Sequence, residues 1–242
     1  MAHKFNVKEM HRLDSPERRK ILPPEETLIK AGLRIKDIFI DIGCGIGYFS
    51  IPASIIIGNE GKVFSLDTSS EMLEELERRI YEKKIRNIKP ILSESYKFPL
   101  ESNIGTFALI SNVLHEVDDK LSFLKETNRV LLEEGTLCIL EWQKKETERG
   151  PPLEDRLSES EIKNQLEKTN FKLINSFPIG EFFSAYISKK LSIWISIRLE
   201  LLNLHLPFRK DLKDPINRFF FNGIPTNSSL LTDLTSSIET KE

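Results

Sequence analysis

The residues between 41 and 67 are of types and at spacings that suit the binding of a small ligand with anionic or sugar groups. The segment Asp41-Ile-Gly43-Cys-Gly45-Ile-Gly47 places glycines at alternate positions, between a β-rich run and a helical stretch. Glycines allow a positive φ and a close approach of backbone to ligand, and amides at a helix start face an anionic group. Asp67 follows Gly47 by 20 residues, where an acid after the next strand can accept both hydroxyls of a ribose.

The spacing of the glycines separates two kinds of cofactor. The dinucleotide fingerprint requires a glycine at position 48, and Tyr48 stands there. A nicotinamide-dependent oxidoreductase is therefore the weaker interpretation. The pattern Asp-x-Gly-x-Gly-x-Gly resembles motif I of the class I methyltransferases that use S-adenosylmethionine, in particular the small-molecule, type 11-like family. In that family the loop wraps the methionine end of the cofactor, and the acid after the second strand holds the ribose.

The resemblance extends over about residues 12–190 and implies that S-adenosyl-L-methionine is the cofactor. Ser93-Glu94-Ser95 looks like the loop after the third strand, with Glu94 in place of the usual Asp that accepts from the adenine amino group. Ser111 and Asn112 look like the segment after the fourth strand. The cofactor-binding residues that the resemblance implies are Asp41, Gly43, Cys44, Gly45, Gly47, Asp67, Thr68, Ser93, Glu94, Ser111 and Asn112.

His115 is the candidate catalytic residue. It follows the fourth predicted strand, at the edge where acceptor and methyl group should meet, and histidine titrates near neutrality, as a general base requires. A histidine that only stabilises the start of a helix or a loop is the alternative, and it stays open. Glu141 and Trp142 end the fifth strand and are expected to line the acceptor pocket, although packing explains Trp142 as well.

Strand and helix signals alternate from residue 38 onward, which predicts βαβ units and a parallel sheet covered on both faces. The fold class is therefore α/β, with a mostly parallel sheet and a closing antiparallel pair, and the resemblance implies that it is the doubly wound, seven-stranded Rossmann-like methyltransferase fold. Helices are expected over 24–31, up to 57, from a capping box at 68–71 to 83, from 118 or 119 to a stop at Gly135, and from a capping box at 158–161 to about 170. Strands are expected over 38–42, 62–66, 88–92, 106–111, 136–141, 172–177 and 182–188.

Three segments are predicted along the chain. Residues 1–34 form a helical leader or lid, residues 35–190 the S-adenosylmethionine-binding domain, and residues 191–242 an extension of unknown role. In the leader, Arg12, Arg18 and Arg19 are donors suited to a carboxylate such as the one at the methionine end of the cofactor. Hydrophobic residues alternate over 191–201, which fits a half-buried strand and an amphipathic helix equally, so a dimer surface and a lid both stay open.

Composition limits the partners. Lys and Arg number 35 and Asp and Glu 37, for a net charge of −2, so a dedicated nucleic-acid binder is not expected. Cys44 and Cys138 exclude a disulfide scaffold and a Cys-only zinc site, and no metal is expected. No apolar run resembles a membrane span or a signal peptide. We expect a cytoplasmic protein with a small-molecule substrate and no membrane partner, with a homodimer as one assembly to test.

The resemblance implies an enzyme that moves the methyl group of S-adenosylmethionine to an unidentified small-molecule acceptor by in-line displacement. The alternative is a catalytically inactive S-adenosylmethionine-binding module. Ala108 stands where the family usually has Asp, and the turn before Gly135 keeps one glycine of the usual pattern. These two departures from the family motivate the alternative.

Overall fold

The computed structural model describes residues 7–192. The chain divides into two compact units, residues 1–196 and 197–242, and the described residues belong to the first. Residues 193–242, which hold most of the predicted extension, lie outside the described residues. The division of the chain at 34 and 190 stays a prediction.

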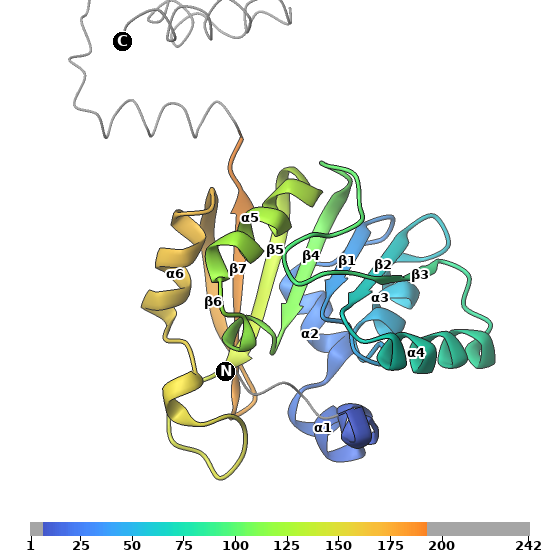
Figure 1. Cartoon of the computed structure of the whole chain (residues 1–242), viewed down its shortest axis with the longest axis horizontal. Coiled ribbons are helices and arrows are strands. Elements are labelled where there is room, and N and C mark those ends of the chain that lie inside the picture. The colour runs from blue at the N-terminus through green and yellow to red at the C-terminus, as the bar shows by residue number, and fades with distance from the viewer. Residues whose placement is uncertain (1–6, 193–242) are drawn as a thin grey trace, which may run out of the picture. The chain divides into compact units, whose positions relative to one another are not determined.

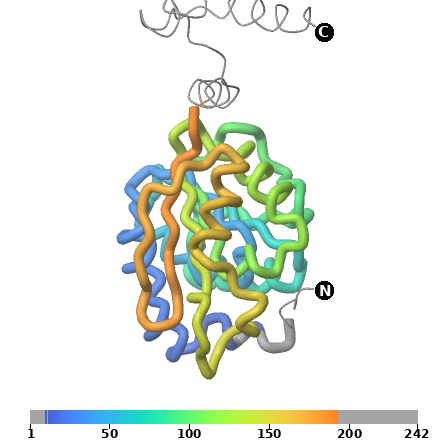
Figure 2. The backbone as a smooth tube through the Cα atoms, turned by 90° about the vertical axis from the view of Figure 1, so that its left-hand side faces the viewer, coloured from blue at the N-terminus to red at the C-terminus, as the bar shows by residue number. Residues whose placement is uncertain are grey.

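A seven-stranded sheet runs through the described unit in the order β3-β2-β1-β4-β5-β7-β6, from β6 on the left of Figure 1 to β3 on the right. The first five strands are parallel, and β7 is antiparallel to both β5 and β6. The predicted doubly wound fold with its closing antiparallel pair is thereby confirmed. Figure 2 shows that pair in orange at one edge of the sheet. The strands are β1 (Ile38–Ile42), β2 (Lys62–Asp67), β3 (Ile88–Leu92), β4 (Gly105–Ser111), β5 (Leu131–Trp142), β6 (Phe171–Ile179) and β7 (Phe183–Lys190).

Helices cover both faces of the sheet. Phe39 of β1 belongs to a core cluster with buried residues of α2, α3 and α4, and its neighbour Ile40 belongs to a second cluster with residues of α5 and α6. Successive residues of a strand point to opposite faces, so β1 contributes to both cores. The α-helices are α1 (Pro16–Ile21), α2 (Pro24–Ala31), α3 (Ser50–Ile57), α4 (Ser70–Lys83), α5 (Lys120–Val130) and α6 (Glu159–Glu167), and the 3-10 helices are η1 (Val7–Asp14), η2 (Leu114–Glu116) and η3 (Leu153–Asp155).

Local signals placed most helix ends correctly. α2 starts at Pro24 and ends before Gly32, which has a left-handed φ of 98°. The capping box of α6 forms as predicted, because the Ser158 side chain accepts from the Glu161 amide and the Glu161 carboxylate accepts from the Ser158 amide. Asp119, one of the two predicted caps, begins α5 by accepting from the amide of Ser122.

Three helix boundaries differ from the sequence prediction. The N-cap of α4 is Ser69, whose hydroxyl accepts from the Met72 amide, so the predicted cap at Thr68 is one residue too early. α5 ends at Val130, because Leu131 already pairs with Gly105 in the sheet. α6 ends at Glu167 rather than near Asn170. At α4, the neighbouring hydroxyl residue Ser69 takes the cap position in place of Thr68. At α5, the pairing of Leu131 with Gly105 ends the helix.

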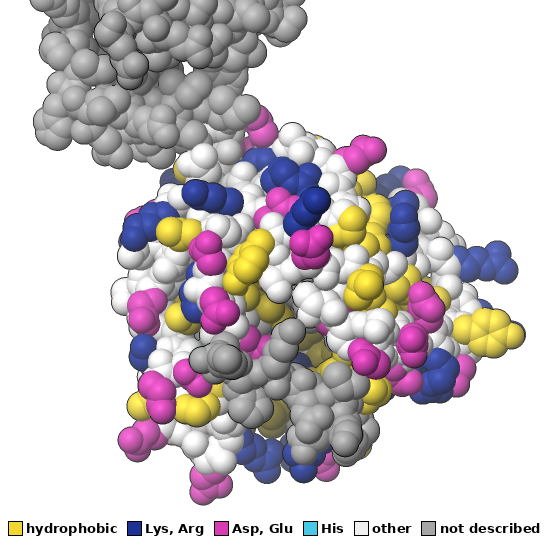
Figure 3. All heavy atoms as spheres, in the orientation of Figure 1, with side chains coloured by type: hydrophobic (Ala, Val, Ile, Leu, Met, Phe, Trp, Pro, Cys, Tyr) yellow, Lys and Arg dark blue, Asp and Glu magenta, His cyan; other side chains and the backbone are white. Residues whose placement is uncertain are grey.

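Among the described residues, none of the helices combines the length and apolar character that crossing a membrane requires. The same residues contain no cluster of three or more His, Cys, Asp or Glu side chains arranged for a metal ion. On the face that Figure 3 shows, basic and acidic side chains are interspersed.

We predict that Gly61→Ala destabilises the fold. A Cβ at Gly61 would lie 2.6 Å from Cβ of Ile57 and 2.8 Å from the backbone oxygen of Asp37, which cannot swing away as a side-chain end can. Overpacking of this kind costs about 1–3 kcal/mol, measured as the free energy of unfolding in urea. Gly32→Ala is the comparison, because it adds backbone strain at a positive φ but meets no atom within 4 Å. A Gly61→Ala protein as stable as the parent would contradict the packing of α3 against β2.

Candidate functional site

The glycine loop crosses from β1 to α3 at the carboxyl edge of the sheet, the usual ligand edge of such folds. Its glycines all have a positive φ, 74° for Gly43, 52° for Gly45 and 83° for Gly47. A Cβ on Gly43 would lie 2.4 Å from Cγ2 of Val113, in the segment after β4. The loop therefore needs glycine for its backbone conformation and for its contact with the neighbouring segment.

Cys44 contributes its backbone to this loop rather than a reactive thiol. Its amide donates to the carbonyl oxygen of Leu66 at 2.9 Å, which ties the loop to the end of β2. The side chain is buried, and Sγ lies 3.5 Å from the carbonyl oxygen of Gly45. Burial, together with the charges of Asp41 and Asp67, raises the pKa of the thiol well above its usual value. The thiol is neutral at physiological pH, so it is not an activated nucleophile.

Asp67 holds the loop from the neighbouring strand. Its Oδ2 accepts from the Gly45 amide at 2.7 Å and its Oδ1 from the Ser69 amide at 3.0 Å. The carboxylate thus links the glycine loop to the cap of α4. It is half-buried, and a carboxylate is the kind of acceptor that ligand hydroxyls require.

Asp41 lies beneath the loop and supports the start of α3. Its Oδ2 accepts from the Ser50 hydroxyl at 2.6 Å, and Ser65 donates to Ser50 at 2.7 Å. Burial raises the pKa of Asp41 to about 7, with the charge of Asp67 adding to it and the Ser50 hydrogen bond opposing it. Asp41 is 2% exposed, so its direct contact with a cofactor stays a prediction.

The predicted residues after β2 and β3 lie beside Asp67. The Ser93 amide donates to the Asp67 carbonyl oxygen at 2.9 Å, so the end of β3 is joined to the end of β2. Thr68 and Glu94 are exposed, and Glu94 forms an isolated bridge with Lys97. The two exposed side chains are accessible to a ligand in this region, and their contact with a cofactor stays a prediction.

Asn112 carries an unsatisfied polar atom at the carboxyl end of β4. Its backbone has a positive φ of 55°, its amide donates to the Leu140 carbonyl oxygen, and its Nδ2 donates to Oγ of Ser111 at 3.2 Å. Its Oδ1 is buried and accepts no hydrogen bond among the described residues. A buried acceptor without a donor is costly, so this atom suits a donor group of a ligand.

His115 and Glu141 form a buried pair at the ends of β4 and β5. His115 Nδ1 lies 2.7 Å from Glu141 Oε2, and the His115 amide donates to Oε1 at 3.3 Å. The exposed fractions of the two side chains are 8% and 2%. Burial alone would lower the pKa of His115, but the hydrogen bond and charge of Glu141, with smaller contributions from Glu116 and Asp155, raise it. Glu141 therefore supports His115. The sequence had suggested that Glu141 lines the acceptor pocket, but its side chain is almost fully buried.

Sequence reasoning missed two partners of the site. It identified His115 but not the role of Glu141, because 26 residues separate them and only the pairing of β4 with β5 brings them together. It also did not place Leu13 of η1, whose Cδ1 would lie 3.3 Å from a Cβ on Gly45. The leader thus contacts the glycine loop directly. No local signal could have identified either contact.

Comparison with known proteins agrees with this geometry. The sequence model of the ubiE/COQ5 methyltransferase family matches residues 24–150, which include β1 to β5 and the glycine loop. The chain belongs to the ubiE/COQ5 methyltransferase family. S-adenosylmethionine is the cofactor that this membership assigns to the methyltransferase fold described above.

Curated relatives and a solved structure are also similar to this chain. A demethylmenaquinone methyltransferase of Staphylococcus saprophyticus is 28% identical over 84% of this chain and 76% of its own. One from Geobacillus sp. (strain WCH70) is 28% identical over 51% of this chain and 53% of its own. The chain spans about half the length of most of the curated relatives it matches. The crystal structure of a SAM-dependent methyltransferase from Aquifex aeolicus covers 78% of this chain and 100% of its own, with 29% identity and a TM-score of 0.75.

The residues of the site fit this cofactor. The glycine loop leaves room for close approach of a ligand at Gly45, where a side chain would meet only the tip of Leu13. The Asp67 carboxylate is an acceptor of the type that ribose hydroxyls need, and the unsatisfied Oδ1 of Asn112 suits an ammonium donor of the methionyl group. The residues that would hold the cofactor are thus the loop, Asp67 and the segment after β4.

We predict that Asp67→Ala weakens the binding of S-adenosylmethionine by about 1.5–3 kcal/mol, the range for a hydrogen bond to a charged group. The loss arises from the ribose hydroxyls and from the released Gly45 amide. Isothermal titration calorimetry measures it. Glu101→Ala, an exposed acid outside the residues named for the site, is the control and should leave the affinity unchanged. An Asp67→Ala protein with the parent's affinity would remove Asp67 from the site.

We predict that Asp41→Asn flattens the dependence of stability on pH. The folded-state pKa is about 7, above the value of 3.8 expected in the unfolded chain. The folded state therefore binds the proton more tightly, and the free energy of unfolding falls as pH rises between these two values, by up to about 1.4 kcal/mol per unit.

Asparagine still accepts from Ser50 but has no proton to lose, so the stability of the variant relative to the parent should rise from pH 5 to pH 8. Urea unfolding at several pH values measures the difference. The exposed Asp118→Asn serves as the matched control. Parallel pH curves for the parent and Asp41→Asn would show that Asp41 is ionised throughout.

Proposed function

We propose that the protein transfers the methyl group of S-adenosylmethionine to a small-molecule acceptor by in-line displacement, with His115 taking the acceptor's proton. The observation that carries the proposal is the buried His115–Glu141 pair beside the glycine loop. Family membership supports the reaction class. When bound, the cofactor supplies a methyl group activated by its sulfonium, so the protein's task is to position the acceptor and manage its proton.

The pair is arranged as a general base and its orienting acid. Neutral His115 donates its Nδ1 proton to Glu141, which leaves Nε2 as the acceptor for a substrate proton. The charge of Glu141 stabilises the imidazolium that forms and raises the pKa of His115. A base with a raised pKa takes a proton more readily but is neutral in a smaller fraction of molecules at pH 7.

The position of the pair supports its role. Val113, two residues before His115, lies against Gly43, so η2 and the glycine loop are in contact. The segment after β5 is also close, because the charge of Asp155 in η3 contributes to raising the pKa of His115. That segment is rigidly organised: the Arg156 guanidinium donates to oxygens of Gln143, Lys145, Thr147, Arg149 and Pro151. An acceptor held between these segments would meet His115.

A reduced quinone ring is the first acceptor to test. The relatives described above act, by name, on demethylmenaquinone. A ring hydroxyl of a reduced quinone carries a proton that neutral His115 can take, and its removal makes the adjacent ring carbon more nucleophilic. Cytoplasmic location and a homodimer stay predictions.

The alternative, a binding module without transfer, has less support in the fold. Ala108 is fully buried in the middle of β4, paired with Ile40 on one side and Leu137 on the other. Gly135 lies at the amino end of β5, where a Cβ would approach the Gly105 oxygen. Both departures from the family pattern therefore lie away from the carboxyl edge that holds His115, and neither affects the proposed chemistry.

We predict that His115→Ala lowers the rate of methyl transfer by about 10²–10⁴, the usual contribution of a general base. Glu141→Gln should lower the rate and move the rising limb of the pH–rate profile to lower pH, because removing the charge lowers the pKa of His115. Reduced demethylmenaquinone is the acceptor used, and formation of S-adenosylhomocysteine is measured.

Both variants should bind S-adenosylmethionine with the parent's affinity in calorimetry. Glu116→Gln is the matched control, since its carboxylate lies 3.9 Å from Nε2 and contributes less to the pKa. An unchanged rate in His115→Ala would defeat the assignment of the base. Cofactor binding without turnover on a broad panel of acceptors would favour the inactive module.

A further inference from the structure

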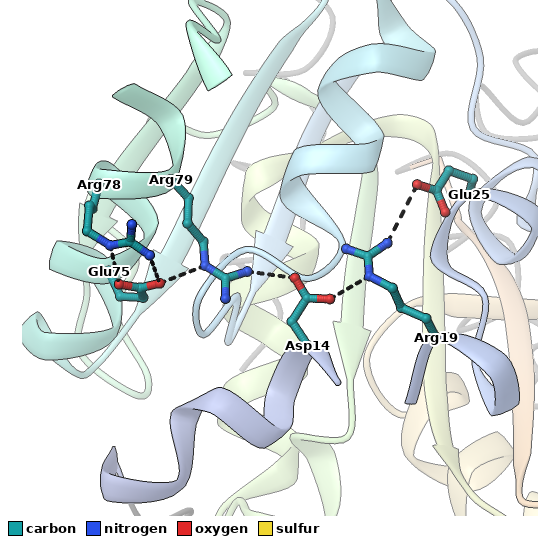
Figure 4. A network of polar contacts seen from close by, with 6 residues as sticks. All are labelled: Asp14, Arg19, Glu25, Glu75, Arg78 and Arg79. Atoms are coloured by element: carbon teal, nitrogen blue, oxygen red, sulfur yellow. Dashed lines mark hydrogen bonds and ion pairs between the residues drawn. The ribbon is translucent and has the colours of Figure 1, made fainter. Parts of the chain in front are cut away.

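Segment 7–22, which comprises η1 and α1, is held on the methyltransferase fold by a chain of ion pairs (Figure 4). Asp14, at the end of η1, accepts from Arg19 Nε at 2.6 Å and from Arg79 Nη1 of α4 at 2.7 Å. Arg79 also donates to Glu75 at 2.8 Å, and Arg19 lies 3.9 Å from Glu25 of α2. The network joins the segment to α4 and α2, so the position of α1 is defined.

These ion pairs keep the acidic side chains of the network ionised. Burial alone would raise the pKa of Asp14, but its hydrogen bonds and charge interactions with Arg19 and Arg79 lower it. The hydrogen bond from Arg78, with that from Arg79, lowers the pKa of Glu75 to about 2. Asp14 is therefore ionised at neutral pH and shared between Arg19 and Arg79.

Arg18 differs from its neighbour Arg19. Both guanidinium groups lie over the Tyr48 ring, at 4.7 Å from its centre for Arg18 and 5.6 Å for Arg19, but Arg19 is also paired with Asp14. The Arg18 amide donates to the hydroxyl of Ser15, but none of the groups that the structure describes accepts a hydrogen bond from the Arg18 guanidinium. Burial lowers the pKa of Arg18, so its surroundings disfavour the charge. A guanidinium with five N–H donors, held in a desolvated place without an acceptor, suits an anionic ligand.

The Tyr48 ring places Arg18 beside the glycine loop. Tyr48 directly follows Gly47, and its hydroxyl donates to the carbonyl oxygen of Leu22 at 2.6 Å. The same segment contacts the loop through Leu13, opposite Gly45. Arg18 thus lies on the leader, next to the loop whose amides would face the amino-acid end of the cofactor.

We infer that Arg18 binds the carboxylate of the methionyl group of S-adenosylmethionine, an inference that rests on the proposed function. A guanidinium matches a carboxylate with two parallel hydrogen bonds, and this carboxylate is the only one in the cofactor. The Tyr48 ring holds the plane of the guanidinium, and the Asp14 network holds the helix that carries it. Arg18 therefore distinguishes ligands with the carboxylate from those without it.

Two ligands that differ in this group test the inference by binding alone. S-adenosylhomocysteine carries the carboxylate, and 5′-methylthioadenosine lacks it while keeping the adenosine and the sulfur. In calorimetry, Arg18→Ala should weaken S-adenosylhomocysteine by about ten- to a hundredfold, the range for a charge-assisted hydrogen bond. The affinity for 5′-methylthioadenosine should change by less than about twofold. Circular dichroism checks that the variant is folded.

Arg19→Ala is the matched control, because it removes an arginine from the same helix that is already paired with Asp14. It should affect both ligands equally. Equal loss of both ligands in Arg18→Ala, or no loss of either, would overturn the inference and leave Arg18 a packing residue. A parent protein that binds neither ligand would instead overturn the proposed function.

If Arg18→Ala does not fold, Arg18→Lys tests the inference instead, because it keeps the positive charge. A lysine cannot form the two parallel bonds, so it should weaken S-adenosylhomocysteine by a smaller factor and leave 5′-methylthioadenosine unchanged. Parent-like binding of both ligands by Arg18→Lys would contradict the two-bond contact.

Discussion

The hydrogen bond from the Gly45 amide to the Asp67 carboxylate is the interaction on which the site depends. It joins the loop after β1 to the end of β2, and the same carboxylate accepts from Ser69 at the start of α4. Because Val113 lies directly against Gly43, the segment after β4 takes its position from the same loop. The carboxyl ends of three strands are thus arranged around one turn of backbone that only glycine can form.

Charge is distributed unevenly around this turn. Asp41 and Asp67 lie on the side of the sheet, and burial brings the first of them close to neutrality at pH 7. Arg18 lies in the leader, and no described carboxylate accepts a hydrogen bond from its guanidinium. A cofactor with ribose hydroxyls in its adenosine part and a carboxylate in its amino-acid part matches these charges. The proposed base is separate from these charges, because His115 is hydrogen-bonded to Glu141.

Sequence patterns predicted the elements well where the signal was local. The five residues of β1 and the five of β3 fall at the predicted positions, 38–42 and 88–92. The errors fall where a second residue competes for the same role. Ser69 takes the cap predicted for Thr68, and Leu131 leaves the helix because a sheet partner at Gly105 offers a longer-range contact. Local propensity cannot weigh such contacts, since their partners are distant in the chain.

The sequence by itself determined the glycine loop and the acid beside it, because the roles of Gly43, Gly45, Gly47 and Asp67 in this turn follow from residue type and from spacing along two adjacent strands. Only the tertiary structure decided which charges remain available. Arg18 and Arg19 are neighbours of the same type and both lie over the Tyr48 ring, yet of the two it is Arg19 that forms an ion pair with Asp14. Likewise, Glu141 is an ordinary strand-end acid until the pairing of β4 with β5 brings it to His115. Hydrogen bonds and burial act over a few ångströms, so the fold determines which groups they join.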